Sequence, residues 1–157
     1  MEDAVENLHG TAIALGASAV LIRGASGSGK SDLALRCLAL APTALIASPA
    51  MLVADDRVLL TRSGDRLKVE APATIRGKLE VRGLGILSVP YAPSADLVLV
   101  ADLVAAGETE RLPEETADTG ILGLRRKLVR IEPFAAAAPI KLLLALARAN
   151  AGPKTVV

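Results

Sequence analysis

One eight-residue stretch limits most strongly what this chain can fold into. It fits the pattern G-x-x-x-x-G-K-[ST] at every fixed position, and its residues are Gly24, Ala25, Ser26, Gly27, Ser28, Gly29, Lys30 and Ser31. The apolar, partly β-branched segment 18–23 before it predicts a strand, and segment 32–40 after it predicts a helix. Phosphate-binding loops have this order of strand, loop and helix. We call residues 24–31 the glycine-rich loop.

Phosphate binding explains the residue types of the glycine-rich loop. Glycines let the backbone curl until several N–H groups point into one cavity, and the helix N-terminus adds partial positive charge. Lys30 supplies a mobile ammonium for the outer phosphates, and the hydroxyl of Ser31 can ligate Mg²⁺. We therefore predict that all eight residues bind the phosphates of a nucleotide or a diphosphate. The motif by itself does not name a reaction.

Composition narrows the class of protein. The chain has 157 residues, 52% of them hydrophobic, which predicts one domain over 1–157 with an ample core. Its aromatic residues are Tyr91 and Phe134, and its net charge is +1, so neither a nucleic-acid nor a membrane partner is expected. An acidic N-terminus, a lone Cys37 and the lack of an apolar run of about 20 residues predict a soluble cytoplasmic protein.

The remaining pattern predicts more strands than helices. In chain order we expect a strand over 8–15, strands over 44–47 and 51–54, a hairpin over 57–70, a loop and a short strand over 75–90, a strand over 95–101, an exposed loop over 107–118, a strand over 128–131 and a helix over 139–150. Because strands predominate, the fold class is α/β with a mixed sheet, not a strictly alternating βαβ array.

Two adjacent carboxylates, Asp55 and Asp56, follow the predicted strand 51–54. In a phosphate-loop protein, a metal-linked carboxylate is expected at such a strand end. Neighbouring strand residues point to opposite sides, so one carboxylate can face a metal and the other an incoming hydroxyl. The alternative is a solvated turn pair. Against it stands the cost of ending a buried strand with two acids that have no role.

Two further residues are candidates by position. His9 is the only histidine and lies beside the strand that neighbours the glycine-rich loop, where it is either structural or able to orient a nearby carboxylate. Glu80 stands in a glycine-rich stretch among the basic residues Arg76, Lys78 and Arg82. That pattern is common, and by itself it is compatible with an anion-binding or metal-binding loop.

Taken together, four runs resemble the HPr kinase/phosphorylase family. They are His9–Gly10, the glycine-rich loop with Asp32, residues 53–58, and residues 79–89. The last run, Leu-Glu-Val-Arg-Gly-Leu-Gly-Ile-Leu-Ser-Val, is close to the family's E-[IV]-R-G-L-G-[IL]-[IL] signature. The resemblance covers residues 8–125 and is limited to the catalytic domain, so the chain resembles short family members that lack the N-terminal domain. It implies a phosphate-loop core related to phosphoenolpyruvate carboxykinase.

The resemblance implies an ATP-dependent protein serine kinase that uses Mg²⁺. Its substrate would be HPr, the small phosphocarrier of the sugar phosphotransferase system. Lys30 would contact the β- and γ-phosphates, and Ser31 and Glu80 would hold Mg²⁺. Longer family members form hexamers, so the resemblance also implies a homo-oligomer.

Four residues would then carry the transfer itself. By resemblance, Asp56 is the base that takes the serine proton, with Asp55 as the alternative. His9 would pair with that carboxylate. Arg111 resembles the family's mobile-loop arginine, which neutralises charge on the transferred phosphoryl group.

Two departures from the family pattern limit the prediction. Ala25 stands where the family usually has an acid, and segment 132–139 lacks the basic residue of the Pro-Gly-Arg-Asn run found in members that also dephosphorylate HPr. We therefore expect a kinase with weak or absent phosphorylase activity. The alternatives are a nucleotide-binding regulatory module without transfer activity and a small-molecule kinase on the same core. The presence of His9, Asp55 and Asp56 favours an enzyme, because nucleotide binding alone needs no base.

Overall fold

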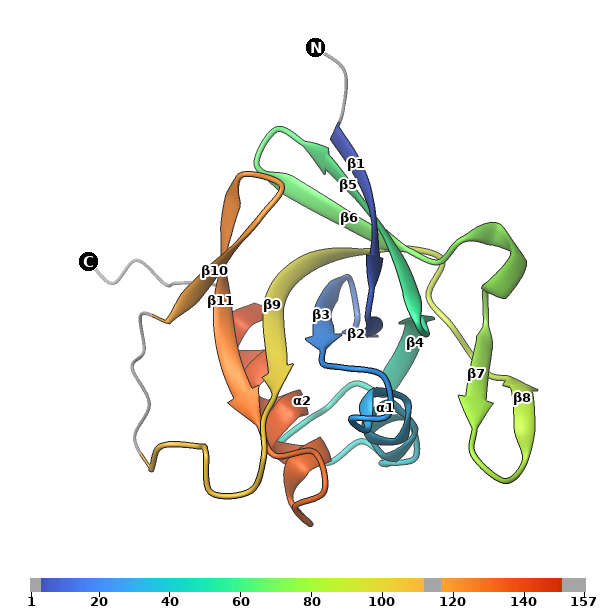
Figure 1. The fold of residues 1–157 in the computed structure, drawn as a ribbon, viewed down its shortest axis with the longest axis vertical. Helices are drawn as coiled ribbons and strands as arrows, with labels where there is room; N and C mark the ends of the chain where they lie inside the picture. Colours follow the sequence, from blue (N-terminus) through green and yellow to red (C-terminus); the bar gives the residue numbers. More distant parts are fainter. Residues whose placement is uncertain (1–3, 112–116, 151–157) are drawn as a thin grey trace.

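The computed structural model describes residues 4–111 and 117–150. Its elements are β1 (Ala4–His9), β2 (Thr11–Leu15), β3 (Ser18–Arg23), α1 (Lys30–Leu38), β4 (Ala50–Ala54), β5 (Arg57–Ser63), β6 (Arg66–Glu70), the 3₁₀ turn η1 (Ala73–Ile75), β7 (Lys78–Val81), β8 (Gly85–Ser88), β9 (Ala95–Leu103), β10 (Asp118–Ile121), β11 (Leu124–Ile131) and α2 (Ala138–Asn150) (Figure 1).

Within the described residues, nine strands form one mixed sheet, which confirms the expected class. The path runs β1-β5-β6-β9-β3-β2-β4, and β11 also pairs with β9 and carries β10 at its outer edge. The pairs β3–β9 and β9–β11 are parallel, and the other pairs are antiparallel. Strand β6 pairs with the first residues of β9, and β11 pairs with the last ones, so the sheet divides along β9.

The central strands are buried on both faces. Every residue of β2 is buried, and its alternate residues belong to two different cores. Ile13 packs with α1 and α2 on one face, and Ala12 packs with β5 and β6 on the other. Neither α1 nor α2, the helices of the described residues, is long enough and apolar enough to cross a membrane. The central strands therefore give the glycine-rich loop and the end of β4 a rigid base.

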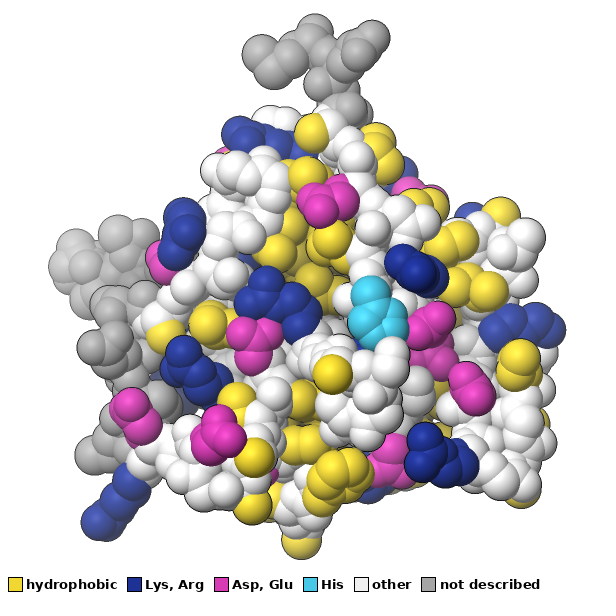
Figure 2. Space-filling model, in the orientation of Figure 1, with side chains coloured by type: hydrophobic (Ala, Val, Ile, Leu, Met, Phe, Trp, Pro, Cys, Tyr) yellow, Lys and Arg dark blue, Asp and Glu magenta, His cyan; other side chains and the backbone are white. Residues whose placement is uncertain are grey.

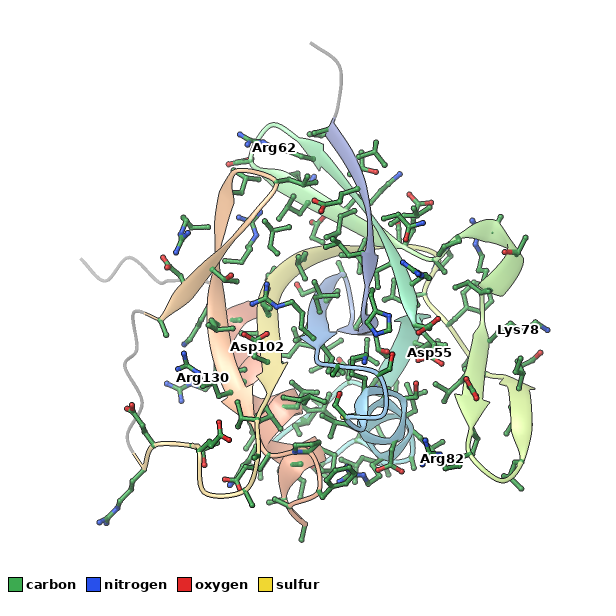
Figure 3. The ribbon with its side chains drawn as sticks, viewed as in Figure 1. Asp55, Arg62, Lys78, Arg82, Asp102 and Arg130 are labelled. Carbon is green, nitrogen blue, oxygen red and sulfur yellow. The ribbon has the colours of Figure 1, made fainter. Side chains whose placement is uncertain are left out.

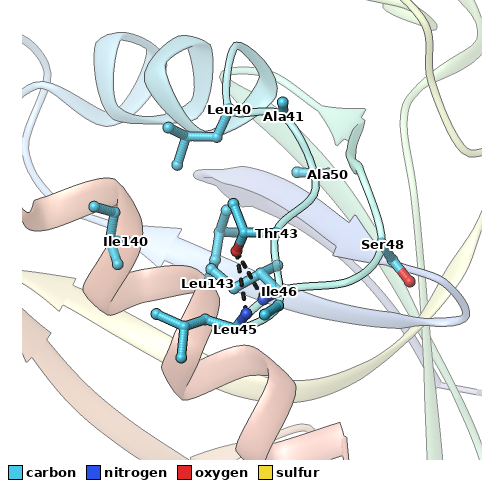
Figure 4. A pocket seen from close by; sticks show the side chains of 10 residues that line it. Leu40, Ala41, Thr43, Leu45, Ile46, Ser48, Ala50, Ile140 and Leu143 are labelled. Carbon is cyan, nitrogen blue, oxygen red and sulfur yellow. Dashed lines mark hydrogen bonds between the residues drawn. The ribbon is translucent and has the colours of Figure 1, made fainter.

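Two strand predictions were wrong for local reasons. Segment 8–15 is divided at Gly10, where a Cβ atom would lie 2.9 Å from Cδ1 of Leu21, and β1 leaves the centre to pair with β5. Segment 44–47 forms no strand. There the Thr43 hydroxyl accepts hydrogen bonds from the N–H groups of Leu45 and Ile46, which competes with strand pairing (Figure 4).

Two hairpins were predicted only in part. The stretch 75–90 contains a separate two-stranded sheet, β7–β8, instead of one short strand. The predicted strand 128–131 is the end of the longer β11, which pairs with the unpredicted β10. The other predicted strands and both helices are present, and part of the predicted exposed loop, residues 112–116, lies outside the described residues.

Candidate active site

The glycine-rich loop connects β3 to α1, as predicted. Gly27 and Gly29 have φ angles of 80° and 103°, in the left-handed region that favours glycine. Gly24 is needed for space, because a Cβ atom there would lie 2.5 Å from the Ser28 hydroxyl oxygen. That hydroxyl is buried and has no hydrogen-bond partner among the described residues. The loop backbone thus has the tight curl that a phosphate cradle requires.

Lys30 is the first residue of α1, and its side chain turns back into the loop. Its Nζ donates hydrogen bonds to the carbonyl oxygens of Gly24, at 2.8 Å, and Ala25, at 3.0 Å. The residue is 6% exposed, and burial lowers its pKa, an effect that the carboxylates of Asp56 and Asp55 oppose. The ammonium therefore lies beside the curled backbone, where it would neutralise a bound phosphate.

Asp55 is the centre of a buried hydrogen-bond network at the end of β4 (Figure 3). Its Oδ1 accepts from the hydroxyls of Ser31, at 2.6 Å, and Thr11, at 3.0 Å. Its Oδ2 accepts from the backbone N–H of Glu80, at 3.1 Å. Asp55 is 6% exposed, so these three donors replace the water that a buried carboxylate loses. One side chain thereby ties α1, β2 and β7 together.

Asp56 has a constrained backbone at the turn between β4 and β5. Its φ is 69°, which is uncommon for a residue with a side chain. The N–H of Arg57 donates to the carbonyl of Asp55 at 2.8 Å, so Asp56 is the middle of a three-residue turn. The carbonyl of Asp56 accepts from Gly10 N–H at 3.0 Å, and its N–H donates to the Thr11 hydroxyl at 3.4 Å. Such strained positions are concentrated at functional sites.

The side chain of Asp56 differs from that of Asp55 in its surroundings. It is 68% exposed, and its Oδ1 lies 3.3 Å from Nδ1 of His9. The histidine itself lies on the surface in Figure 2 (cyan). The structure therefore brings the predicted pair of His9 and Asp56 together beside the loop. It leaves Asp56 open to solvent, whereas the oxygens of Asp55 are occupied.

The residues around Asp55 fit a magnesium ion. The Ser31 hydroxyl and the Asp55 carboxylate are hard oxygen ligands, and Mg²⁺ usually takes one or two protein oxygens together with phosphates and water. The Glu80 contact with Asp55 is made by its backbone, while its side chain is exposed. In residues 4–111 and 117–150, no three His, Cys, Asp or Glu side chains form a metal site on their own. Phosphate oxygens would therefore have to complete the coordination.

Arg111 lies in a different place from the other predicted residues. It is exposed and lines a polar cavity of about 230 Å³ together with Arg130, Glu132 and Lys141. The Glu132 carboxylate accepts hydrogen bonds from the Thr109 hydroxyl and the Gly107 N–H, which lower its pKa. Among the described residues, no hydrogen bond or ion pair joins Arg111 to the glycine-rich loop.

Three residues at the site were missed by the sequence reasoning. Thr11 is completely buried and joins both aspartates, and its signal was a polar residue within an otherwise apolar strand. Arg23, just before the loop, forms a two-point pair with Asp102 at the end of β9, with N···O distances of 2.7 and 3.0 Å. In the sequence, Arg23 and Asp102 each stand out as a charged residue near the end of an apolar run.

A second cavity is unsuited to the same chemistry. This apolar pocket of about 280 Å³ lies between segment 40–50 and α2 (Figure 4). Its lining residues are Leu40, Ala41, Thr43, Ala44, Leu45, Ile46, Ser48, Ala50, Ile140 and Leu143. None of these side chains is titratable, so the cavity offers no acid, base or cation. The candidate site is the loop with its aspartates.

Known proteins are similar to this chain in sequence and in fold. The family model described as HPr Serine kinase C-terminal domain matches residues 3–151. The HPr kinase/phosphorylases of Cupriavidus metallidurans and Burkholderia lata are each 37% identical over 135 residues, which are 80% of this chain. The chain spans 39% of the length of each of these relatives.

A solved structure has the same fold. It is the Hpr(Ser) kinase/phosphatase from Coxiella burnetii, with a TM-score of 0.69 and 23% identity over 93% of this chain and 96% of that one. At this identity the likeness concerns the fold alone. The family model covers almost the whole chain, and the family signature of residues 79–89 lies on β7 and β8, next to Asp55. The chain therefore belongs to the HPr serine kinase C-terminal domain family.

Proposed function

We propose that this protein is an ATP-dependent serine kinase that phosphorylates an HPr-type phosphocarrier protein. The observation that carries the proposal is that two adjacent carboxylates beside Lys30 have different surroundings. Asp55 is fully hydrogen-bonded and linked to Ser31, whereas Asp56 is exposed and paired with His9. A nucleotide-binding module would need the first arrangement only, because binding requires no exposed base.

The glycine-rich loop would hold the phosphates of ATP. Its backbone N–H groups, the N-terminus of α1 and the Lys30 ammonium supply positive charge to the β- and γ-phosphates. Ser31 and Asp55 would hold Mg²⁺, with Glu80 as a further carboxylate from β7, and the ion supplies charge neutralisation when bound. Transfer of a phosphoryl group depends mainly on such positioning and neutralisation.

Asp56 would act as the base of the transfer. Its carboxylate takes the proton of the acceptor serine while the serine oxygen forms a bond to the γ-phosphorus and the bond from that phosphorus to the bridging oxygen breaks, which releases ADP. His9 orients the Asp56 carboxylate through the 3.3 Å contact. Arg111 would approach the transferred group after a movement of its loop, as the family resemblance implies.

A transfer assay tests the proposal. The protein is incubated with ATP, Mg²⁺ and HPr from the same cell, and intact mass spectrometry reports phosphoserine on HPr. An HPr whose acceptor serine is replaced by alanine is the matched control. Binding of ATP without any phosphorylated HPr would support the regulatory module, and phosphorylation of a metabolite instead would support the small-molecule kinase.

We also propose that the reverse reaction is weak. Segment 132–139 contains no basic residue, so it offers no cation to an attacking inorganic phosphate. Serine-phosphorylated HPr, Mg²⁺ and phosphate should therefore yield little pyrophosphate. Rapid pyrophosphate release by the wild-type protein would contradict this part of the proposal.

A further inference from the structure

An exposed aromatic ring lies against the glycine-rich loop. Phe134 is 73% exposed, although its neighbour Pro133 is buried. A Cβ atom at Gly29 would lie 3.0 Å from Cζ and 3.1 Å from Cε1 of Phe134. The edge of the ring therefore touches the glycine immediately before Lys30. A single exposed apolar side chain is common on protein surfaces, so the position of this ring beside the glycine-rich loop is the observation that matters.

The segment that carries Phe134 is fixed to α1. The guanidinium of Arg36 donates a hydrogen bond to the carbonyl of Pro133, and its Nε is held by Asp32 at 3.0 Å. Farther along the chain, the thiol of Cys37 donates a hydrogen bond to the carbonyl oxygen of Pro139, with an S···O distance of 3.8 Å. The connection between β11 and α2 therefore holds the ring at a defined position beside the start of α1.

We propose that Phe134 is the platform on which the base of the bound nucleotide stacks. The inference rests on the proposed function, since it requires the phosphates of ATP to occupy the glycine-rich loop. The ribose and base must then extend beyond the loop, and the ring in contact with Gly29 offers them a flat apolar surface. Bases stack on aromatic rings through faces that adenine and guanine share. The subsite therefore accepts purine nucleoside triphosphates with little choice between the two bases.

Inorganic triphosphate separates the base from the phosphates in a binding test. We expect calorimetry to show that Phe134→Ala weakens ATP binding about tenfold, within the range for one stacked base, and leaves triphosphate binding unchanged. Phe134→Tyr should keep the wild-type affinity for ATP, and Phe134→Leu should lose it, because leucine is apolar but has no ring. Leu45→Ala is the matched control, since Leu45 is 70% exposed and lies away from the loop.

A spectroscopic test uses the absence of tryptophan from the sequence. In Phe134→Trp the single indole should be quenched on addition of ATP or GTP, and much less on addition of triphosphate. Equal quenching by triphosphate would mean that the indole responds to phosphate binding in the loop and not to a base. That result would refute the proposed stacking.

The outcomes distinguish this inference from the proposed function. If wild-type protein binds ATP but Phe134→Ala binds ATP and triphosphate as wild type does, the base subsite is refuted while the kinase proposal stands. If wild-type protein binds neither ligand, both fall. If Phe134→Ala changes only self-association in sedimentation or the KM for HPr, the ring belongs to a protein interface and the base subsite is again refuted.

Discussion

The two sides of the glycine-rich loop are built in opposite ways. On one side, the carboxylate side (Thr11, Asp55 and Asp56), a hydrogen-bond network encloses Thr11 and Asp55 and leaves only the carboxylate of Asp56 exposed. On the other, the tail side (residues 132–135), a connecting segment is held through a backbone carbonyl and presents an exposed aromatic ring. The comparison indicates that the sheet fixes the two aspartates that would take part in phosphoryl transfer. The aromatic ring, in contrast, comes from a connecting segment, where sequence and conformation can vary more easily.

The largest expected effect separates the two aspartates of the carboxylate side. Asp56→Asn should lower the rate of HPr phosphorylation by about 10²- to 10⁴-fold, as for loss of a general base, while ATP binding is kept. Asp55→Asn should instead weaken ATP binding in the presence of Mg²⁺. The N–H₂ group of the new amide would face groups that now donate hydrogen bonds to the Asp55 carboxylate. Single-turnover rates and calorimetry check both variants, and full transfer by Asp56→Asn would refute its role as the base.

The second prediction concerns Arg111, which lies apart from the carboxylate side. Arg111→Ala should lower kcat about 10²-fold with ATP affinity nearly unchanged, because a cation that acts only on the transition state does not contribute to ground-state binding. Arg111→Lys, which keeps the positive charge, should lower kcat by less than Arg111→Ala does. Steady-state kinetics and calorimetry measure the two quantities. An unchanged kcat in Arg111→Ala would show that the arginine stays in the cavity beside Glu132.

The third prediction tests how closed the carboxylate side is. Thr11→Val keeps the side-chain shape but removes the hydroxyl that serves both aspartates, so it should lower the free energy of unfolding by about 1–3 kcal/mol. Urea denaturation measures the loss. Thr61→Val on β5 is the control and should have little effect. Equal losses in the two variants would mean that the Thr11 hydroxyl is not special.

The smallest expected effect concerns the cost of burying Lys30. At neutral pH, Lys30→Met should raise the Tm of the nucleotide-free protein by a few degrees, because it removes a buried charge. The folded-state pKa lies below the reference value of 10.5, so at alkaline pH the unfolded chain binds more protons, and the wild type gains stability as pH rises through this interval. The Tm difference should therefore shrink towards about pH 10. A constant difference in a pH series of thermal scans would contradict the prediction.

Local patterns predicted most of the elements, and the failures had physical causes. The run 18–40 was read correctly because its hydrophobic period changes from strand to helix around an unambiguous loop. Segment 8–15 was misread because the packing of Gly10 against Leu21 is invisible without the neighbouring strand. The strand β10 was missed because its stability comes from pairing with β11, and the strand pattern of its four residues is weak.

By itself, the sequence determined the family of the chain and predicted the type of site. The glycine-rich loop, the two aspartates and the run 79–89 are local patterns, and local patterns survive without a tertiary structure. The tertiary structure alone decided that Asp55 is enclosed and Asp56 is open, because burial depends on Thr11, Ser31 and the backbone of Glu80, which come from three other elements. The tertiary structure also placed Phe134 against Gly29, which lies more than a hundred residues earlier in the chain. Only folding brings residues 132–135, the tail side, to the start of α1.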